Sequence, residues 1–381
     1  MTSTLVTNIK QLVTNDPELG TLSDAALVYT DGKICWVGEK TKAPSADSLI
    51  DADGGSVVPG FVDSHTHAIF AGDRLQDFLA RMNGTKYAAG GIKTTVAETR
   101  AASDDSLRNH LENVVTEFTE HGITTFEIKS GYGLDVETEV KLLRIAREFT
   151  EETTFLGAHV IPSEFANDRR AYIDLVKGKM LEAAAPYAKW IDVFCDKGAF
   201  TVDEAREILK VGESHGLLGR LHGNQLGDTG GIELAVELDL ASVDHCTYAT
   251  DAQLESLAAS KTVATLLPGA EFSTRSPYPD ARRFFEKGVN VALATDFNPG
   301  SSYISSMPFV MAIAVRDMHF TPEQALQAAT KGGAAALRRN DIGHLGIGAR
   351  ADLVLLAAPS YEYIAYRPGA NLVKQVLVAN P

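Results

Sequence analysis

Two histidines separated by a single residue form the first candidate metal-binding motif of the chain. His65 and His67 lie at the end of the apolar run 57–64. Residues two apart on an extended strand point to the same side, so both imidazoles can bind one metal ion. Imidazole nitrogen is a common ligand of zinc and of iron. The motif therefore predicts a metal site that further ligands would complete.

Three more residues with metal-binding side chains follow apolar runs later in the chain. His222 ends the run 219–222, His245 ends the run 241–245, and Asp296 follows the run 290–295. Taken singly, each of these residue types is common in cores and loops. Taken together, histidines and a carboxylate at strand ends fit a mononuclear zinc or iron site that leaves room for a water molecule.

The middle of the chain alternates apolar runs with amphipathic stretches, a pattern that predicts the scaffold for these ligands. Near-continuous apolar runs are typical of strands buried on both faces of a parallel sheet. We predict eight such strands, at 57–64, 124–129, 154–159, 190–195, 219–222, 241–245, 262–267 and 290–295. Helical stretches lie between several of them, at 104–121, 136–149, 171–185 and 201–215. Eight strand–helix units predict an α/β fold, the (β/α)₈ TIM barrel, whose strands open onto one face at their C-terminal ends.

Both ends of the chain predict a second, smaller unit made of strands. Residues 26–30 and 33–38 form a hairpin pattern around Asp31 and Gly32, a pair that accepts the positive φ of a tight turn. Apolar strands are also expected at 351–357 and 372–379. We therefore predict a small β-sandwich domain built from residues 1–57 and 346–381, with the barrel spanning 58–345.

Composition and charge limit the partners of the protein. The net charge of −15 disfavours nucleic acid and anionic membrane surfaces, because both would repel the chain at long range. The three cysteines show no CxxC spacing, and the start of the chain lacks the charged and apolar regions of a signal peptide. No apolar run approaches the length of a membrane span. We expect a cytoplasmic protein that acts on a small molecule.

The order of these motifs resembles the amidohydrolase superfamily over essentially the whole chain. The shared pattern is HxH after the first strand, histidines after the fifth and sixth, and an aspartate after the eighth. Several segments are further similar to the imidazolonepropionase family, namely 71–74, 127–134, 157–162, 194–200, 266–272 and 295–302. The resemblance also implies a homodimer, which is usual in the superfamily.

This resemblance implies a metal-dependent hydrolysis of 4-imidazolone-5-propanoate to N-formimidoyl-L-glutamate. His65, His67, His222 and Asp296 would hold one zinc or iron ion, which activates a water molecule for attack on the ring carbonyl. Asp296 would also move the proton of that water to the leaving nitrogen. His245 would polarise the carbonyl or stabilise the oxyanion.

The resemblance also implies a set of substrate-binding residues. Arg74 would bind the propanoate, because a guanidinium forms bidentate pairs with carboxylates. The remaining contacts would come from aromatic, imidazole, amide and turn residues: Tyr87, Tyr132, His159, Gln225, Asn298, Gly300 and Ser301.

Other readings of the same pattern remain open at this point. A hydantoinase-like or dihydroorotase-like enzyme would bridge two metals with a carboxylated lysine after the fourth strand, where Lys197 lies close by. A deaminase would carry glutamate three residues after the strand-five histidine, and this chain has Gln225, whose amide cannot shuttle protons. A catalytically inactive barrel would be expected to have lost ligands. Cys195 and Cys246 flank the site, and their apolar neighbours favour buried structural thiols.

Overall fold

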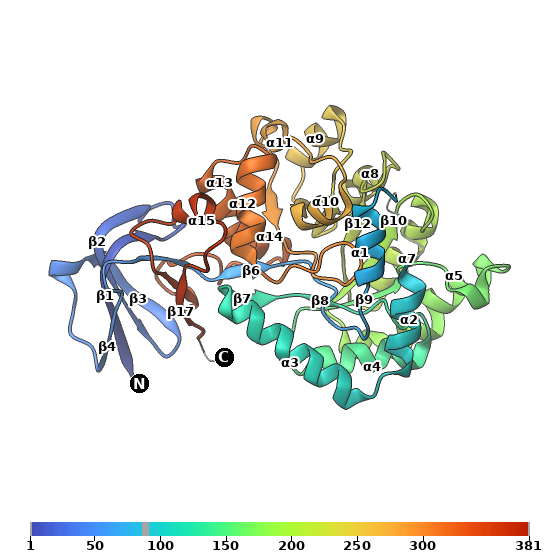
Figure 1. Ribbon diagram of the computed structural model, residues 1–381, viewed down its shortest axis with the longest axis horizontal. Helices are drawn as coiled ribbons and strands as arrows, with labels where there is room; N and C mark the ends of the chain where they lie inside the picture. The colour runs from blue at the N-terminus through green and yellow to red at the C-terminus, as the bar shows by residue number, and fades with distance from the viewer. Residues whose placement is uncertain (1, 86–90, 380–381) are drawn as a thin grey trace.

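The computed structural model describes residues 2–85 and 91–379, which form a curled parallel sheet and a mixed sheet (Figure 1). The expected α/β barrel with a smaller β unit from both chain ends is confirmed. Figure 1 shows the mixed sheet at the left and the helix-covered parallel sheet at the right. No helix in the described part of the chain is both long and apolar enough to cross a bilayer.

The mixed sheet combines strands from both ends of the chain. Its strand order is β17-β16-β5-β1-β2-β3, with β4 beside β1. The strands are β1 (Ser3–Val13), β2 (Thr21–Thr30), β3 (Lys33–Glu39), β4 (Ser48–Asp51), β5 (Ser56–Pro59), β16 (Leu353–Leu356) and β17 (Val373–Leu377). The predicted hairpin is present, with Asp31 and Gly32 at φ of 48° and 73° between β2 and β3. A separate apolar core that includes Val6, Leu27 and Leu353 holds this sheet together. The predicted limits of the two domains stay a prediction.

The parallel strands occupy eight positions within the described residues. They are β6 (Phe61–Asp63), β7 (Ile123–Phe126) with β8 (Ile128–Lys129), β9 (Thr153–Ala158), β10 (Trp190–Cys195), β11 (Leu218–Gly219) with β12 (Leu221–Gly223), β13 (Ser242–His245), β14 (Val263–Leu266) and β15 (Val291–Leu293). Each pairs in parallel with its neighbour. These are the positions that the apolar runs predicted.

The first and last barrel strands meet just beyond their regular portions. Thr66 forms a parallel bridge with Phe297, and the backbone N–H of His67 donates to the Phe297 carbonyl at 2.9 Å. Thr295 donates to the buried Asp63 carboxylate through its backbone N–H at 3.0 Å and its hydroxyl at 2.6 Å. These contacts close the parallel sheet into a barrel, and we call them the seam.

The first predicted strand, 57–64, is divided in the structure. Its first half pairs in the mixed sheet as β5, and its second half pairs in the barrel as β6. The break falls at Gly60, where an added Cβ would lie 2.1 Å from the Thr124 hydroxyl oxygen. Because Gly60 follows a proline and has no side chain, the chain can pass between the two sheets at this point.

Helices cover the outside of the barrel, and several of them begin at a residue whose side chain caps the first turn. They are α1 (Leu75–Met82), α2 (Ile92–Ala101), α3 (Asp104–Glu120), α4 (Val136–Ala146), α5 (Arg169–Leu175), α6 (Leu181–Ala184), α7 (Val202–Ser214), α8 (Gly231–Glu237), α9 (Asp251–Ala258), α10 (Pro268–Thr274), α11 (Ala281–Lys287), α12 (Met307–Asp317), α13 (Pro322–Gln327), α14 (Gly333–Ala336) and α15 (Tyr363–Tyr366). Ser103 caps α3, and Thr201 with Glu204 forms a capping box on α7. The predicted helix 171–185 is interrupted by a π-helical turn at Val176–Met180, where Gly178 leaves helical geometry.

Candidate metal centre and pocket

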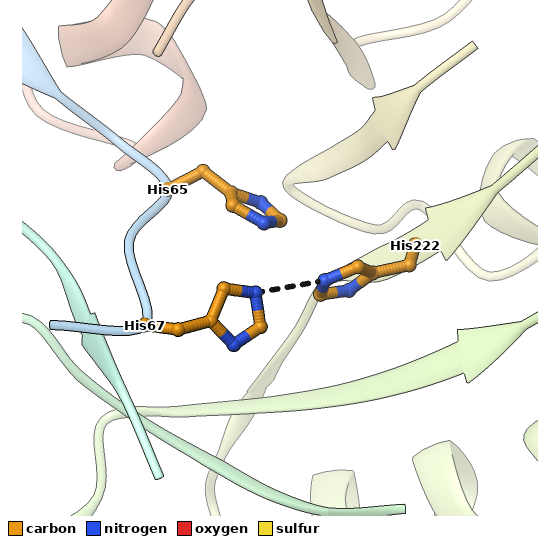
Figure 2. A group of neighbouring side chains, drawn as sticks. All are labelled: His65, His67 and His222. Carbon is orange, nitrogen blue, oxygen red and sulfur yellow. Dashed lines mark hydrogen bonds between the residues drawn. The ribbon is translucent and has the colours of Figure 1, made fainter. Parts of the chain in front are cut away.

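The predicted ligands gather at the C-terminal ends of four barrel strands. His65 and His67 follow β6, His222 lies on β12, His245 ends β13, and Asp296 follows β15. Figure 2 shows the rings of His65, His67 and His222 directed toward one another across the barrel mouth. The seam fixes two of these segments together, because the Asp296 backbone N–H donates to the His65 carbonyl at 3.1 Å.

The ligand atoms of four residues converge within hydrogen-bonding or near-contact distances. The Nε2 atoms of His67 and His222 lie 3.2 Å apart. Oδ1 of Asp296 lies 3.5 Å from His65 Nε2 and 3.6 Å from His67 Nε2. All four side chains are buried. The structure therefore brings His65, His67, His222 and Asp296 into one buried cluster.

These residues fit a metal ion. His65 Nε2 is buried and has no hydrogen-bond partner among the described residues, and the Nε2 atoms of His67 and His222 face each other at 3.2 Å, close enough to bind one ion together. Burial lowers the pKa values of His65 and His67, so both rings stay neutral and keep the lone pair that a metal requires. Burial likewise raises the pKa of Asp296. A bound cation would favour the ionised form of this carboxyl group.

His245 adds a further imidazole to this group. His65, His245 and Asp296 form a second triad whose ligand atoms lie within 4.8 Å of one another. The His245 ring centroid lies 5.5 Å from that of His222, and its buried Nδ1 has no hydrogen-bond partner in the described protein. His245 holds a φ of +80° and Asp296 a φ of +53°, conformations that are uncommon for residues with a Cβ and that are enriched at functional sites.

Two buried carboxylates orient two of the histidines. Asp244 Oδ2 lies 2.6 Å from His65 Nδ1, and Asp192 Oδ2 lies 3.0 Å from His222 Nδ1. A carboxylate accepts the Nδ1 proton, so Nε2 is left with its lone pair directed into the site. This outer contact is common around metal-binding histidines and fixes both the tautomer and the ring orientation.

Lys129 lies beneath the site as a fully buried cation. Its ammonium is 2.8 Å from Asp192 Oδ2 and 3.1 Å from Glu127 Oε1. Glu127 also accepts a hydrogen bond from the Thr66 backbone N–H at 2.9 Å. The neighbouring carboxylates raise the pKa of Lys129 against the opposing effect of burial. The ammonium therefore connects Asp192, which orients His222, with Glu127, which accepts a hydrogen bond from the segment that carries His65 and His67.

A pocket opens above this centre. The predicted residues that line it are His67, Arg74, Tyr132, His159, His222, Gln225, His245, Asp296, Asn298, Gly300 and Ser301. His65 lies buried beside them. Tyr87, also predicted to bind substrate, lies outside the described residues. The apolar residues Ile92, Val160 and Phe194 complete the lining and were not predicted.

The side of the pocket next to His67 carries ring-shaped side chains. His159 stacks on His67 with ring centroids 5.2 Å apart, and Tyr132 lies next to both rings. His159 Nδ1 donates to the Gly131 carbonyl at 2.9 Å. Burial lowers the pKa of His159 to about 3, so its Nε2 is an acceptor at neutral pH.

A tight turn after Asp296 forms another wall. Asn298 Oδ1 accepts hydrogen bonds from the backbone N–H groups of Gly300 at 2.8 Å and Ser301 at 2.7 Å. Asn298 Nδ2 donates to the Asp296 carbonyl at 2.6 Å, and the Ser301 hydroxyl donates to Asp296 Oδ2 at 3.2 Å. The turn is thus attached directly to a candidate metal ligand.

Sequence reasoning did not identify Asp192 and Asp244 as part of the site. Both are charged residues inside apolar strand runs, β10 and β13, and both are fully buried. A charge in such a run is the signal that could have found them, because buried charges are usually paired or functional.

The lysine of the two-metal alternative lies elsewhere. Lys197 is exposed, and an added Cβ on Gly227 would lie 2.4 Å from its ammonium nitrogen. Cys195 and Cys246 are buried free thiols, and burial raises the pKa of Cys195 to about 12 and the pKa of Cys246 well above its usual value. Thiols with such pKa values stay protonated at neutral pH and are poor nucleophiles.

Comparison with known proteins adds two findings. Residues 56–379 match the model of the amidohydrolase family. The chain is 58% identical to the imidazolonepropionase of Streptomyces griseus over 99% of this chain and 98% of the relative. It is 56% identical to the imidazolonepropionase of Mycolicibacterium smegmatis over 99% of this chain and 96% of the relative.

Solved structures share the fold at low sequence identity. A triazine hydrolase variant superposes with a TM-score of 0.80 at 16% identity, covering 99% of this chain and 93% of that one. Guanine deaminase from C. acetobutylicum gives a TM-score of 0.72 at 15% identity, covering 99% of each chain. These two likenesses support the architecture described above.

Proposed function

The chain belongs to the amidohydrolase family, and from this membership and its imidazolonepropionase relatives we infer that it hydrolyses 4-imidazolone-5-propanoate to N-formimidoyl-L-glutamate. The observation that carries this inference is the convergence of three imidazoles and one carboxylate at the base of a pocket that Arg74 also lines. The site thus combines a hydrolytic centre with a cation for an acidic substrate.

We propose that His65, His67, His222 and Asp296 hold one metal ion, either zinc or iron. Their three nitrogens and one oxygen suit both metals, and the short distances among these four side chains support this set. The bound metal would lower the pKa of a water molecule and supply a nucleophile at neutral pH.

Asp296 and His245 then take the acid–base and electrostatic roles. Asp296 Oδ2, which faces Ser301 rather than the histidines, accepts the proton of the attacking water. The water oxygen bonds to the ring carbonyl carbon, the carbon–nitrogen bond of the lactam breaks, and Asp296 returns the proton to the departing nitrogen. The neutral His245 ring donates its N–H to the carbonyl oxygen as negative charge develops there.

The remaining pocket residues bind and orient the substrate. We propose that Arg74 binds the propanoate and that His159 Nε2 accepts a hydrogen bond from a ring N–H. Tyr132 and Gln225 would contact the ring, and the turn of Asn298, Gly300 and Ser301 would bind the carboxylate that the reaction creates. Tyr87 stays a proposed substrate contact by family resemblance alone.

The cellular location, oligomeric state and partners of the enzyme are proposed from its cysteines, its charge and its family. Three free cysteines without a disulfide among the described residues suit the reducing cytoplasm. We propose a homodimer that binds neither nucleic acid nor membrane, which agrees with the net charge of −15.

The test is direct turnover of freshly prepared 4-imidazolone-5-propanoate, followed by loss of ring absorbance and by product identification. Hydantoin, dihydroorotate and guanine serve as control substrates. We expect N-formimidoyl-L-glutamate as product, loss of turnover on chelation, and recovery with zinc or iron. Well-folded, metal-loaded protein that left this substrate intact would refute the proposal, and turnover of a control would name the alternative class.

A further inference from the structure

The guanidinium of Arg74 is held in place before any ligand arrives. Arg74 directly precedes α1, and its side chain is only 7% exposed. Its Nε donates to Asp77 Oδ2 at 2.7 Å. Because this contact uses the Nε donor, Nη1 and Nη2 have no hydrogen-bond partner among the described residues and can donate to a carboxylate.

Two glycines enclose the other end of this side chain. A Cβ built on Gly300 would lie 2.4 Å from Arg74 Nη1. A Cβ built on Gly91 would lie 1.9 Å from Arg74 Nη2 and 2.5 Å from Asp77 Oδ2. Non-bonded atoms do not approach this closely, so any larger residue at either position would displace the guanidinium.

Backbone conformation does not explain these glycines. Gly91 has φ of −68° and ψ of −16°, values that every residue type adopts in a helix. Gly300 is likewise absent from the residues with positive φ. A side chain at either position would therefore act through the space that the Arg74 guanidinium occupies.

The wall formed by Gly300 is tied to the hydrolytic centre. The Gly300 N–H donates to Asn298 Oδ1 at 2.8 Å, and Asn298 Nδ2 donates to the Asp296 carbonyl at 2.6 Å. The position of the guanidinium is thus coupled, through one short turn, to the position of a candidate metal ligand.

We propose that Asp77, Gly91 and Gly300 form a slot that fixes the Arg74 guanidinium relative to the hydrolytic centre, so that the enzyme selects cyclic substrates by the length and charge of their side chain. We call these three residues the arginine slot. This inference rests on the proposed function. A three-carbon side chain that ends in a carboxylate reaches the fixed guanidinium, whereas a shorter side chain or an uncharged amide does not pair with it. Asp77, Gly91 and Gly300 are positioning residues that act through Arg74.

A binding experiment tests the slot without requiring turnover. Calorimetric titration of the metal-loaded protein uses imidazole-4-propanoate, imidazole-4-acetate and imidazole-4-propanamide as probes. We expect the wild-type protein to bind the propanoate at least about tenfold more tightly than either other probe. Gly300→Ala, Gly91→Ala and Asp77→Asn should each weaken propanoate binding about tenfold and change propanamide binding less than about twofold.

Two further variants separate positioning from general damage. Gly369→Ala is the matched control, because a Cβ there would meet nothing within 4 Å, and it should bind all probes as the wild type does. In an Arg74→Lys background the Nη1 atom is gone, so adding Gly300→Ala should cause almost no further loss. Equal losses for propanoate and propanamide, or additive losses in the double variant, would overturn the proposal.

Turnover kinetics give a second test and separate a failure of the arginine slot from a failure of the proposed function. With 4-imidazolone-5-propanoate, Asp77→Asn should raise KM about tenfold and leave kcat within about threefold, since a binding contact common to ground and transition states is weakened. A fall in kcat with unchanged KM would contradict the positioning role. Absence of turnover in the wild type would refute the proposed function alone, because the imidazole probes still report on the slot.

Discussion

Replacing Lys129 by methionine should lower the free energy of unfolding, and the contacts of the Lys129 ammonium set the size of that loss. The ammonium is fully buried, with Asp192 Oδ2 at 2.8 Å and Glu127 Oε1 at 3.1 Å. Removing one partner of a buried ion pair costs about 3–5 kcal/mol, because the remaining charge is left without compensation. Asp192 keeps His222 and Glu127 keeps the Thr66 N–H, so we expect the lower half of that range.

This free energy converts into a measurable shift in melting temperature. An unfolding entropy of about 2.1 cal/mol/K per residue, summed over 381 residues, makes each kcal/mol worth slightly more than about 1 °C. Lys129→Met should therefore lower Tm by about 4 °C in chelator-treated protein, where metal binding cannot mask the loss. Circular dichroism during slow heating measures it.

A double variant shows whether charge is the cause. Glu127→Gln removes one buried negative charge and keeps an oxygen to accept from the Thr66 N–H. Combined with Lys129→Met, it should cost at least about 1 kcal/mol less than the sum of the single variants. A Tm within about 1 °C of the wild type for Lys129→Met, or strict additivity in the pair, would refute the reasoning.

Three further predictions concern the candidate metal centre and Glu271, a buried carboxyl group on α10. Asp192→Asn should weaken metal binding about 10- to 100-fold in competition with a chromophoric chelator, since it removes the carboxylate that orients His222, and an unchanged affinity would contradict that role. His245→Ala should lower kcat about 10²- to 10³-fold at full metal content, whereas loss of metal in this variant would show that His245 is a ligand. Burial raises the pKa of Glu271 from 4.5 to about 7, so its contribution to stability is complete below pH 4.5 and is lost as pH rises through 7. Glu271→Gln should remove that part of the pH dependence of Tm in chelator-treated protein. A pH dependence of Tm equal to that of the wild type would contradict this role of Glu271.

The sequence predicted the barrel because the features that define it are local. Each strand is a short apolar run, and the histidines and Asp296 follow those runs directly, so their meeting requires only that parallel strands share an edge. The hairpin at Asp31 and Gly32 was also predictable, since its turn depends on two adjacent residues.

Features that depend on packing between distant segments were not predictable. The division of the first strand at Gly60 depends on a contact with Thr124, and the pairing of Lys129 with Asp192 depends on which side chains meet inside the barrel. The arginine slot joins Gly91 and Gly300 across about 200 residues of sequence, and a glycine in a loop gives no indication of what occupies the space beside it. Such relations require coordinates, because neither periodicity nor spacing encodes them.

The seam has a consequence for how the protein is made. Asp63 and Thr295, which are hydrogen-bonded across the seam, are 232 residues apart. The first barrel strand, β6, therefore leaves the ribosome long before the last strand, β15, has been synthesised. At synthesis rates of about 5–20 residues per second, β6 waits roughly 10–50 s with one edge unpaired. His65 and His67 are present throughout that interval, but the carboxylate of Asp296 arrives only with the closing strand. The proposed ligand set is therefore complete only once the barrel has closed.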